Sequence, residues 1–168
     1  MKNDVFQIDD YLNVKTLNEN NLNYIEQLDK IKKHNKEYIN NQLLINKDYF
    51  DNMFSNVDKN IKLDEEQRKA ILKNEDYNLI IAGAGSGKTT TMMAKIKYLV
   101  DKKDILQNEI LAISFAKKNT EELKEKLKKQ FNLDVNVITF HKLGLSIIEQ
   151  NTNKRYSVIE DNIKSRFI

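Results

Sequence analysis

The glycines of this chain are concentrated at one place. Its 168 residues contain four glycines, three of them at positions 83, 85 and 87, and no proline. Glycine adopts positive φ readily and lets a backbone approach another group closely. A chain that places three of its four glycines in five residues needs an unusual backbone there, and this turn constrains the fold more than any other feature.

The turn has the sequence of a phosphate-binding loop. Residues 82–89 read AGAGSGKT, which fits the pattern A/G-x4-G-K-T with alanine in the first place. In such a loop the backbone N–H groups point at a polyphosphate, and the positive end of the following helix adds to the attraction. We expect Lys88 to contact the β- and γ-phosphates of ATP and Thr89 to ligate Mg²⁺, so these two residues take the catalytic roles. The expected nucleotide-binding residues of the loop are Ala82, Gly83, Ala84, Gly85, Ser86, Gly87, Lys88, Thr89 and Thr90.

The segments on either side of the loop predict its surroundings. Residues 78–82, NLIIA, form a short apolar run that predicts a buried strand, and residues 88–100 have helical spacing. A flexible glycine loop at the end of a strand is the alternative interpretation, which the combination of strand, loop and helix disfavours. The dinucleotide-binding pattern G-x-G-x-x-G fails because Lys88 stands where its third glycine belongs.

The remainder of residues 61–168 alternates expected strands and helices. The apolar runs 110–115 and 135–140 predict two more buried strands, and helices are expected at 65–73 with Asp64 as the N-cap, at 120–131 and at 141–150. Residues 156–168 indicate a further strand and the start of a helix. Strands separated by helices of this length pair in parallel through right-handed crossovers. This part of the chain is therefore expected to be an incomplete α/β domain of the P-loop NTPase type.

Residues 1–60 predict an α-helical N-terminal arm. Apolar residues recur every three positions from Leu22 to Ile31, and the stripe resumes at Tyr38 after a polar break around His34 and Asn35. A second short helix is expected at 49–57, while residues 1–17 receive no assignment. The apolar face of this arm must cover the next domain or another part of the protein.

Composition excludes several classes of protein. There are no cysteines and two histidines, which excludes disulfide frameworks, thiolate zinc sites and histidine-rich metal centres. No apolar run reaches the length of a membrane span, and the N-terminus carries acids where a signal peptide needs an apolar core. We therefore expect a cytoplasmic protein without a membrane partner. The net charge of +3 neither demands nor forbids a nucleic acid partner.

An acidic stretch, LDEEQR at residues 63–68, precedes the loop. It is not the carboxylate pair of a Walker B motif, because that pair follows a strand that comes after the loop. Here the acids lie at a helix N-terminus, where they favour the helix dipole. Gln67 has two interpretations: it caps the helix, or its amide meets the edge of a purine, to which it can both donate and accept.

With these pieces, the chain resembles the N-terminal part of superfamily 1A helicases of the UvrD/Rep type. In that family L-x-x-x-Q-R precedes AGAGSGKT by about this interval, and residues 110–118, ILAISFAKK, are similar to the next block, I-L-A-x-T-F-T-N-K. Residues 139–143, TFHKL, are similar to T-F-H-S-L. Residues 34–37 and 49–51, followed by Leu63, look like the segment before the motor in the helicase IV subgroup. Differences from the pattern occur at Thr90, Ser114, Ala116, Lys117, Asn119, Thr120 and Lys142.

The resemblance implies a first RecA-like domain over residues 61–168 that binds ATP and Mg²⁺, with Gln67 on the adenine. It also implies contacts to single-stranded DNA, in which an aromatic ring stacks on any base and a lysine pairs with phosphate. The residues implied for these contacts are Ser114, Phe115, Lys118, Phe140 and His141. The alternatives are that both phenylalanines are core residues, that His141 caps its own helix, and that Lys118 is a solvated helix residue.

Some motifs that a complete helicase needs are not found in this sequence. No convincing D-E-x-x pair follows Lys88, and the nearest candidate, Glu160-Asp161, has the reversed order. We therefore expect the front part of an ATP-dependent 3′-to-5′ DNA helicase, acting on single-stranded DNA or duplex junctions, with the second RecA-like domain C-terminal to it. The fragment itself is expected to hydrolyse almost no ATP. One alternative is a stand-alone nucleotide-binding module that docks on a partner through residues 18–57. A small P-loop kinase is disfavoured, because only Arg68, Arg155 and Arg166 could supply the arginines of a lid.

Overall fold

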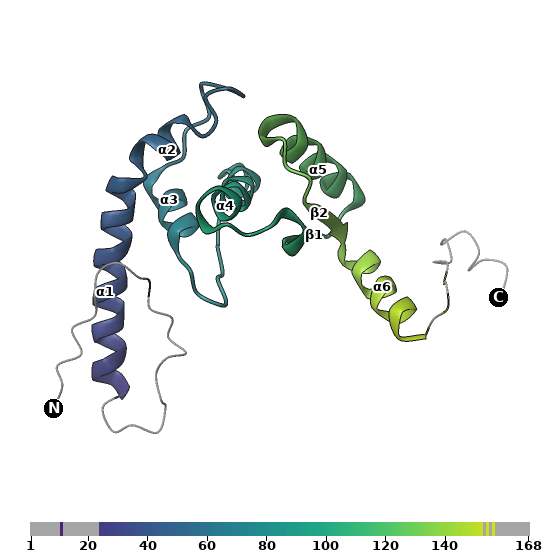
Figure 1. Cartoon of the computed structure of the whole chain (residues 1–168), viewed down its shortest axis with the longest axis horizontal. Helices are drawn as coiled ribbons and strands as arrows, with labels where there is room; N and C mark the ends of the chain where they lie inside the picture. The colour runs from purple at the N-terminus through teal and green to yellow at the C-terminus, as the bar shows by residue number, and fades with distance from the viewer. Residues whose placement is uncertain (1–10, 12–23, 153, 155, 157–168) are drawn as a thin grey trace. The chain divides into compact units, whose positions relative to one another are not determined.

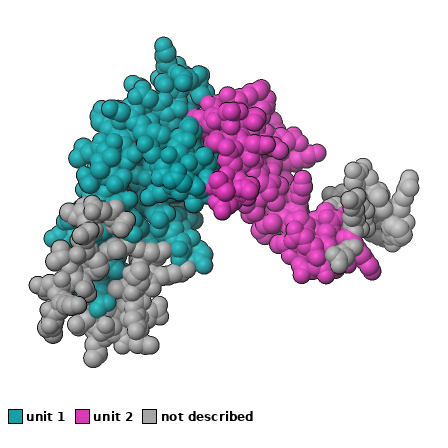
Figure 2. All heavy atoms as spheres, viewed as in Figure 1, with its two compact units in different colours: residues 1–105 teal, residues 106–168 magenta. Residues whose placement is uncertain are grey.

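A computed structural model describes residues 11, 24–152, 154 and 156 (Figure 1). The chain divides into two compact units, residues 1–105 and 106–168 (Figure 2). The first unit contains helices α1 (Tyr24–Ile45), α2 (Lys47–Asn52), α3 (Glu65–Leu72) and α4 (Lys88–Lys103). The second contains a 3₁₀ turn (Gln107–Glu109), β1 (Leu111–Ser114), α5 (Lys117–Phe131), β2 (Asn136–Thr139) and α6 (Phe140–Thr152). None of the described helices is long and apolar enough to cross a membrane.

Helix α1 runs without interruption through His34 and Asn35, the two polar residues at which the apolar stripe is interrupted in the sequence. Both residues lie on the buried stripe of the helix, between Ile31 and Tyr38, at the same helical spacing as its apolar members. Both side chains are buried and both make interactions. A polar residue can occupy a buried helix position when its polar atoms have partners.

The arm is packed into the first unit. Helix α1 contacts α3 and α2, and α3 contacts α4. The buried side chains of this unit come from all four helices and from the turn after α2, and include Ile39, Phe50, Phe54, Ile71, Leu72, Met93, Ala94, Ile96 and Tyr98. The apolar face expected for residues 18–57 is therefore covered, in its described part, by the helices on either side of the glycine loop.

The second unit is built on a parallel pair of strands. Strand β1 pairs with β2 in parallel, as expected from the sequence, and the register places Leu111 opposite Asn136 and Ser114 opposite Thr139. Helix α5 connects the strands and buries Leu123 and Leu127 against them. Its end is closed by Asn132, whose φ of 54° is left-handed and whose N–H donates to the carbonyl oxygen of Lys128 at 3.0 Å.

The strand expected at residues 78–82 is absent from the described structure. The segment has no regular secondary structure, and Leu79 and Ile81 are 86% and 90% exposed. A strand needs a neighbour for its backbone N–H and C=O groups, and the described part of the first unit contains no other strand. The expected strand at 156–168 falls outside the described residues, apart from Tyr156.

Helix boundaries differ from expectation by a few residues. Helix α5 starts three residues early, at Lys117, and α6 starts at Phe140, which was expected to end a strand. The short helix expected at 49–57 is α2, which begins at Lys47 and ends at Asn52. Helix α4 continues to Lys103 and ends at Asp104 in left-handed backbone with φ of 53°. These shifts leave the order and type of the elements unchanged.

A lysine of α4 closes the C-terminal end of α3. The ammonium group of Lys95 donates to the carbonyl oxygens of Ile71 at 2.6 Å and Lys73 at 2.7 Å. Carbonyls in the last turn of a helix have no partner within it, so they need an outside donor. Lys95 therefore fixes α3 against the helix that follows the glycine loop.

Lys95 is expected to make stability depend on pH. Burial, together with the nearby charge of Lys103, lowers the pKa of Lys95 from 10.5 to about 8. Between these two pKa values the unfolded chain binds more protons than the folded chain. The contribution of Lys95 to the free energy of unfolding is therefore present above pH 10.5 and is lost as pH falls through about 8. We expect the free energy of unfolding of the wild type, relative to Lys95→Met, to rise by about 1–2 kcal/mol from about pH 7.5 to about pH 9.5. Guanidinium unfolding of both proteins measures this, and parallel pH profiles would contradict it.

Candidate nucleotide-binding site

The glycine loop has the special backbone that its sequence predicts. Gly85 and Gly87 have φ of 73° and 77°, in the left-handed region that favours glycine. Gly87 is the residue before α4, and its carbonyl oxygen accepts from the N–H of Thr91 at 2.8 Å. Within the loop, the hydroxyl of Ser86 donates to the carbonyl oxygen of Gly83 at 2.8 Å. The loop is thus a closed turn that ends at a helix N-terminus, where anions are favoured.

Lys88 folds back over this turn. Its Nζ donates to the carbonyl oxygen of Gly83 at 2.6 Å and to that of Ala82 at 3.1 Å. Lys88 and Thr89 are both exposed. Because a phosphate oxygen is a stronger partner for an ammonium group than a neutral carbonyl, Lys88 can exchange these bonds for an incoming anion.

Gln67 acts as a cap and also reaches the loop. The N–H of Asp64 donates to Gln67 Oε1 at 2.9 Å, and the N–H of Gln67 donates to Asp64 Oδ1 at 2.8 Å. This reciprocal pair is a capping box, which confirms both the N-cap expected at Asp64 and the capping interpretation of Gln67. In addition, Gln67 Nε2 donates to the carbonyl oxygen of Ser86 at 3.2 Å. The side chain therefore lies beside the loop, and the purine contact stays a prediction.

A cavity of about 380 Å³ opens at this place. Its walls come from the glycine loop, the start of α3 and the segment before α3, and are formed by Asn60, Ile61, Lys62, Asp64, Gln67, Gly85, Ser86, Gly87 and Thr90. The volume lies in the range of small-molecule sites. Sequence reasoning missed the wall at residues 60–62. The one sequence signal for this wall is the polar run at residues 58–60, which is typical of a turn. In the structure the N–H of Asn60 donates to Asp58 Oδ1 at 2.8 Å.

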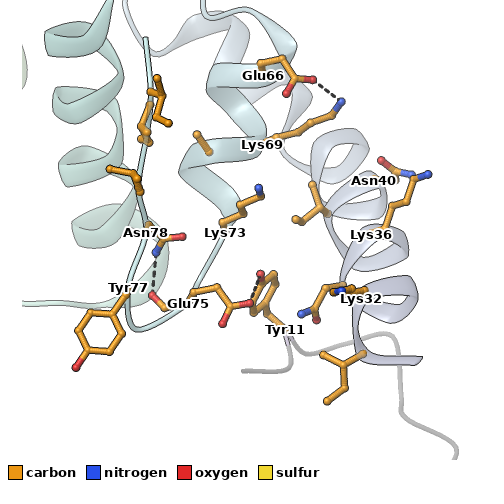
Figure 3. Close-up of a pocket in the computed structure, with 17 residues that line it drawn as sticks. Tyr11, Lys32, Lys36, Asn40, Glu66, Lys69, Lys73, Glu75, Tyr77 and Asn78 are labelled. Carbon is orange, nitrogen blue, oxygen red and sulfur yellow. Dashed lines mark hydrogen bonds and ion pairs between the residues drawn. The ribbon is translucent and has the colours of Figure 1, made fainter. Parts of the chain in front are cut away.

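A larger cavity of about 770 Å³ lies elsewhere in the first unit (Figure 3). It is lined by residues of α1 and α3 and by residues 73–81, and no predicted site residue contributes to it. Figure 3 shows Tyr11 and Glu75 pointing toward each other, with the Tyr11 hydroxyl donating to the Glu75 carboxylate at 2.7 Å. The smaller cavity, which has the glycine loop as its wall, remains the candidate nucleotide site.

Substitutions at two of the loop glycines, Gly83 and Gly87, are expected to differ in effect. A Cβ on Gly87 would lie 2.7 Å from Gln67 Nε2, and the positive φ of this residue is strained for alanine. A Cβ on Gly83 meets nothing within 4 Å, and its φ is not positive. We expect Gly87→Ala to lower the free energy of unfolding by about 1–2 kcal/mol and to displace Gln67, while Gly83→Ala has little effect on stability. Chemical denaturation measures both, and equal losses would contradict the described backbone.

The residues predicted to contact DNA lie at the C-terminal ends of β1 and β2 in the second unit. Phe115 and Phe140 are 84% and 67% exposed, so the core alternative is wrong for both rings. The rings of Phe115 and His141 meet edge to face with centroids 6.3 Å apart. The start of α6 is capped by Thr139, whose Oγ1 accepts from the N–H of Lys142 at 3.2 Å. The structure thus brings together residues that lie 26 positions apart in the sequence.

The other two members of this set lie close by in the chain. Ser114 is the last residue of β1 and is partly exposed, and Lys118 is an exposed residue in the first turn of α5. In parallel strands the carboxyl ends meet at one edge of the sheet, which explains the clustering. The geometry offers exposed aromatic rings and a cation on one edge, as stacking on bases and pairing with phosphate require.

For the metal, the described residues offer few ligands. No group of three or more histidine, aspartate or glutamate side chains that could hold an ion occurs in the described part of the chain. Magnesium on a nucleotide keeps several waters and uses phosphate oxygens with one or two protein ligands. The exposed hydroxyl of Thr89, next to the loop, suits that partial role.

The described elements define a mixed α/β chain with a small parallel sheet and a glycine loop at a helix N-terminus. Residues 63–167, well over half of the chain, match the UvrD/REP helicase N-terminal domain. The chain therefore belongs to the UvrD/REP helicase family.

Several named DNA helicases and helicase homologs are similar to this chain. DNA helicase IV of Escherichia coli (strain K12) is 32% identical over 122 residues, which is 72% of this chain and 17% of that protein. A probable DNA helicase II homolog of Mycoplasma pneumoniae is 32% identical over 108 residues, 62% of this chain and 15% of the relative. The ATP-dependent DNA helicase PcrA of Staphylococcus aureus (strain Mu50) is 37% identical over 95 residues, 55% of this chain and 13% of the relative. The chain thus spans between about one eighth and one sixth of the length of these relatives.

Proposed function

We propose that this chain is the N-terminal part of an ATP-dependent 3′-to-5′ DNA helicase, and that residues 61–168 form the front of its first RecA-like domain. One observation carries the proposal: in a chain of the UvrD/REP family, a turn with two left-handed glycines ends at the N-terminus of α4, and Lys88 folds over it. The names of the relatives, which include an ATP-dependent DNA helicase, support it. The place of action would be the cytoplasm.

The nucleotide would be held by the loop. The backbone of residues 83–87 and the N-terminal end of α4 would hold the phosphates, and Lys88 would leave the carbonyls of Ala82 and Gly83 to bind the β- and γ-phosphates. The Thr89 hydroxyl would ligate Mg²⁺. When bound, the ion neutralises charge on the phosphates. Gln67, already beside Ser86, would present its amide to adenine.

Single-stranded DNA would bind at the edge of the sheet in the second unit. The exposed rings of Phe115 and Phe140 offer stacking surfaces, Lys118 offers a cation, and Ser114 and His141 offer polar contacts. Stacking does not depend on the identity of the base, which suits a protein that moves along any sequence.

Movement would need parts beyond those described. The carboxylates that activate water, and a second RecA-like domain that closes on the nucleotide, would lie C-terminal to this chain in the intact helicase. Domain closure is what couples a bound nucleotide to motion. We therefore expect the 168-residue chain to bind Mg·ATP without efficient turnover.

The alternative was a stand-alone nucleotide-binding module that docks on a partner through residues 18–57. In the described part of the arm, Ile39, Phe50 and Phe54 are buried within the first unit. Those three side chains are engaged inside the protein, whereas Leu44 and Ile45 of α1 are 76% and 65% exposed. The helicase proposal is favoured by the family match rather than by the packing of the arm.

Two titrations of the 168-residue chain test the proposal. Calorimetry with Mg·ATP should give saturable binding, with NMR shifts concentrated at residues 83–90. Fluorescence anisotropy with labelled oligo-dT should give binding that weakens as salt rises, because phosphate contacts release counterions. Absence of any nucleotide response at the loop would contradict the proposal.

A further inference from the structure

The short helix α2 contacts both elements that carry the candidate nucleotide residues. On the α4 side, Phe50 stacks on Tyr98 with ring centroids 6.1 Å apart, and the Tyr49 hydroxyl donates to Asp101 at 2.9 Å. On the α3 side, Asp51 forms an ion pair with Arg68 at 2.6 Å. Helix α2 therefore braces α3, which carries Gln67, against α4, which begins at Lys88.

Arg68 makes three different interactions at this brace. Its Nη2 meets Asp51 Oδ1, its Nε donates to the carbonyl oxygen of Leu63 at 2.9 Å, and its guanidinium lies 5.8 Å from the centre of the Phe50 ring. The side chain is only 17% exposed. A planar guanidinium can satisfy all three partners at once, whereas a lysine ammonium cannot reproduce the arrangement.

The bond to Leu63 connects this brace to Gln67. Leu63 directly precedes Asp64, which exchanges two hydrogen bonds with Gln67 in the capping box. The rotamer of Gln67 that satisfies this box also places its Nε2 3.2 Å from the carbonyl oxygen of Ser86. A chain of contacts thus runs from Asp51 through Arg68, Leu63 and Asp64 to the side chain that lies beside the glycine loop.

From this geometry we propose that Arg68 is a positioning residue for base recognition, held by Asp51 of α2. It holds the start of α3 so that the Gln67 amide faces the base of a bound nucleotide, and it touches no nucleotide itself. The inference rests on the proposed function, because it requires a nucleotide on the loop. The affinity for a nucleotide then has two parts. The loop and Lys88 bind the phosphates, and the brace determines how much the base contributes.

The test compares three probes on the full 168-residue chain: Mg·ATP, Mg·GTP and magnesium with inorganic tripolyphosphate, which has no base. The variants are Arg68→Lys and Asp51→Asn. The control is Lys47→Gln, since Lys47 also pairs with Asp51, at 3.1 Å, but has a 65% exposed side chain and no contact with α3 among those described. We expect Arg68→Lys to weaken the binding of ATP about three- to tenfold and to leave the affinity for tripolyphosphate unchanged. The ratio of the ATP affinity to the GTP affinity should move toward one. Asp51→Asn should change the ratio in the same direction, and Lys47→Gln should change nothing.

A double-mutant cycle separates positioning from general support of the fold. If Arg68 acts through Gln67, then Arg68→Lys should have no further effect on ATP affinity when Gln67→Ala is already present. Additive losses, an unchanged ATP-to-GTP ratio, or a parallel fall in tripolyphosphate binding would overturn the inference. If Arg68→Lys fails to fold, Asp51→Asn takes its place in the cycle. A wild-type chain that binds none of the probes would instead overturn the proposed function.

Discussion

Lys88→Ala is expected to weaken binding of Mg·ATP to the 168-residue chain about 10- to 100-fold, with little change in stability. The loss follows from removal of a charge-assisted contact to phosphate in a loop whose remaining donors are neutral backbone groups. Stability should be maintained because Lys88 is exposed and its described bonds are to the carbonyls of Ala82 and Gly83, which water can satisfy instead. Isothermal titration measures the affinity, and chemical unfolding measures the stability.

A matched control for this substitution is Lys124→Ala, an exposed lysine on α5 in the second unit. It removes the same charge from the chain without touching the loop, so it reports the effect of net charge alone. Wild-type affinity in Lys88→Ala would mean that the glycine turn does not hold phosphate. An equal loss in Lys124→Ala would mean that the nucleotide is attracted by overall charge.

The loop could be predicted because its residues leave few choices. Glycine is needed where φ is positive, and two of the three clustered glycines have positive φ. The helix after the loop and the capping box at Asp64 also follow from local sequence, since spacing and capping act over three or four residues. These features require no knowledge of the rest of the molecule.

The segment 78–82 shows where such reasoning fails. An apolar run indicates that a segment can be buried in a sheet, but pairing depends on a neighbour that the run does not specify. In the described first unit that neighbour is missing, and Leu79 and Ile81 stay exposed. At His34 and Asn35 residue type is a poor guide to burial, because the helical position of these two polar residues places them on the buried side of α1.

The brace around Arg68 had no sequence signal at all. Asp51 and Arg68 are 17 positions apart, and Tyr49 and Asp101 are 52 apart, so neither pair is visible in any local pattern. The edge that gathers Phe115 and His141 could be predicted in part. Parallel pairing of two strands, which was expected, is enough to bring their C-terminal ends together.

Two phenylalanines of this chain should respond to alanine in opposite ways. Phe50 is 2% exposed and packs against Tyr98, whereas Phe115 is 84% exposed. Truncation of a buried ring leaves a cavity, so we expect Phe50→Ala to destabilise the first unit by about 3–5 kcal/mol. We expect Phe115→Ala to cost less than about 0.5 kcal/mol, because an exposed ring leaves no cavity. Hydrogen exchange followed by mass spectrometry measures each unit separately.

The same pair tests the proposed DNA edge. Loss of one stacking ring is worth about 1–3 kcal/mol per base, so Phe115→Ala should weaken binding to oligo-dT at least about fivefold while the chain stays folded. Anisotropy titration at fixed salt measures this, since salt alone changes such affinities. A Phe115→Ala protein that loses as much stability as Phe50→Ala would show that the ring is a core residue. A protein that is equally stable and binds DNA like the wild type would show that the ring is exposed for some other reason, and the proposed DNA interface would lose its main stacking surface.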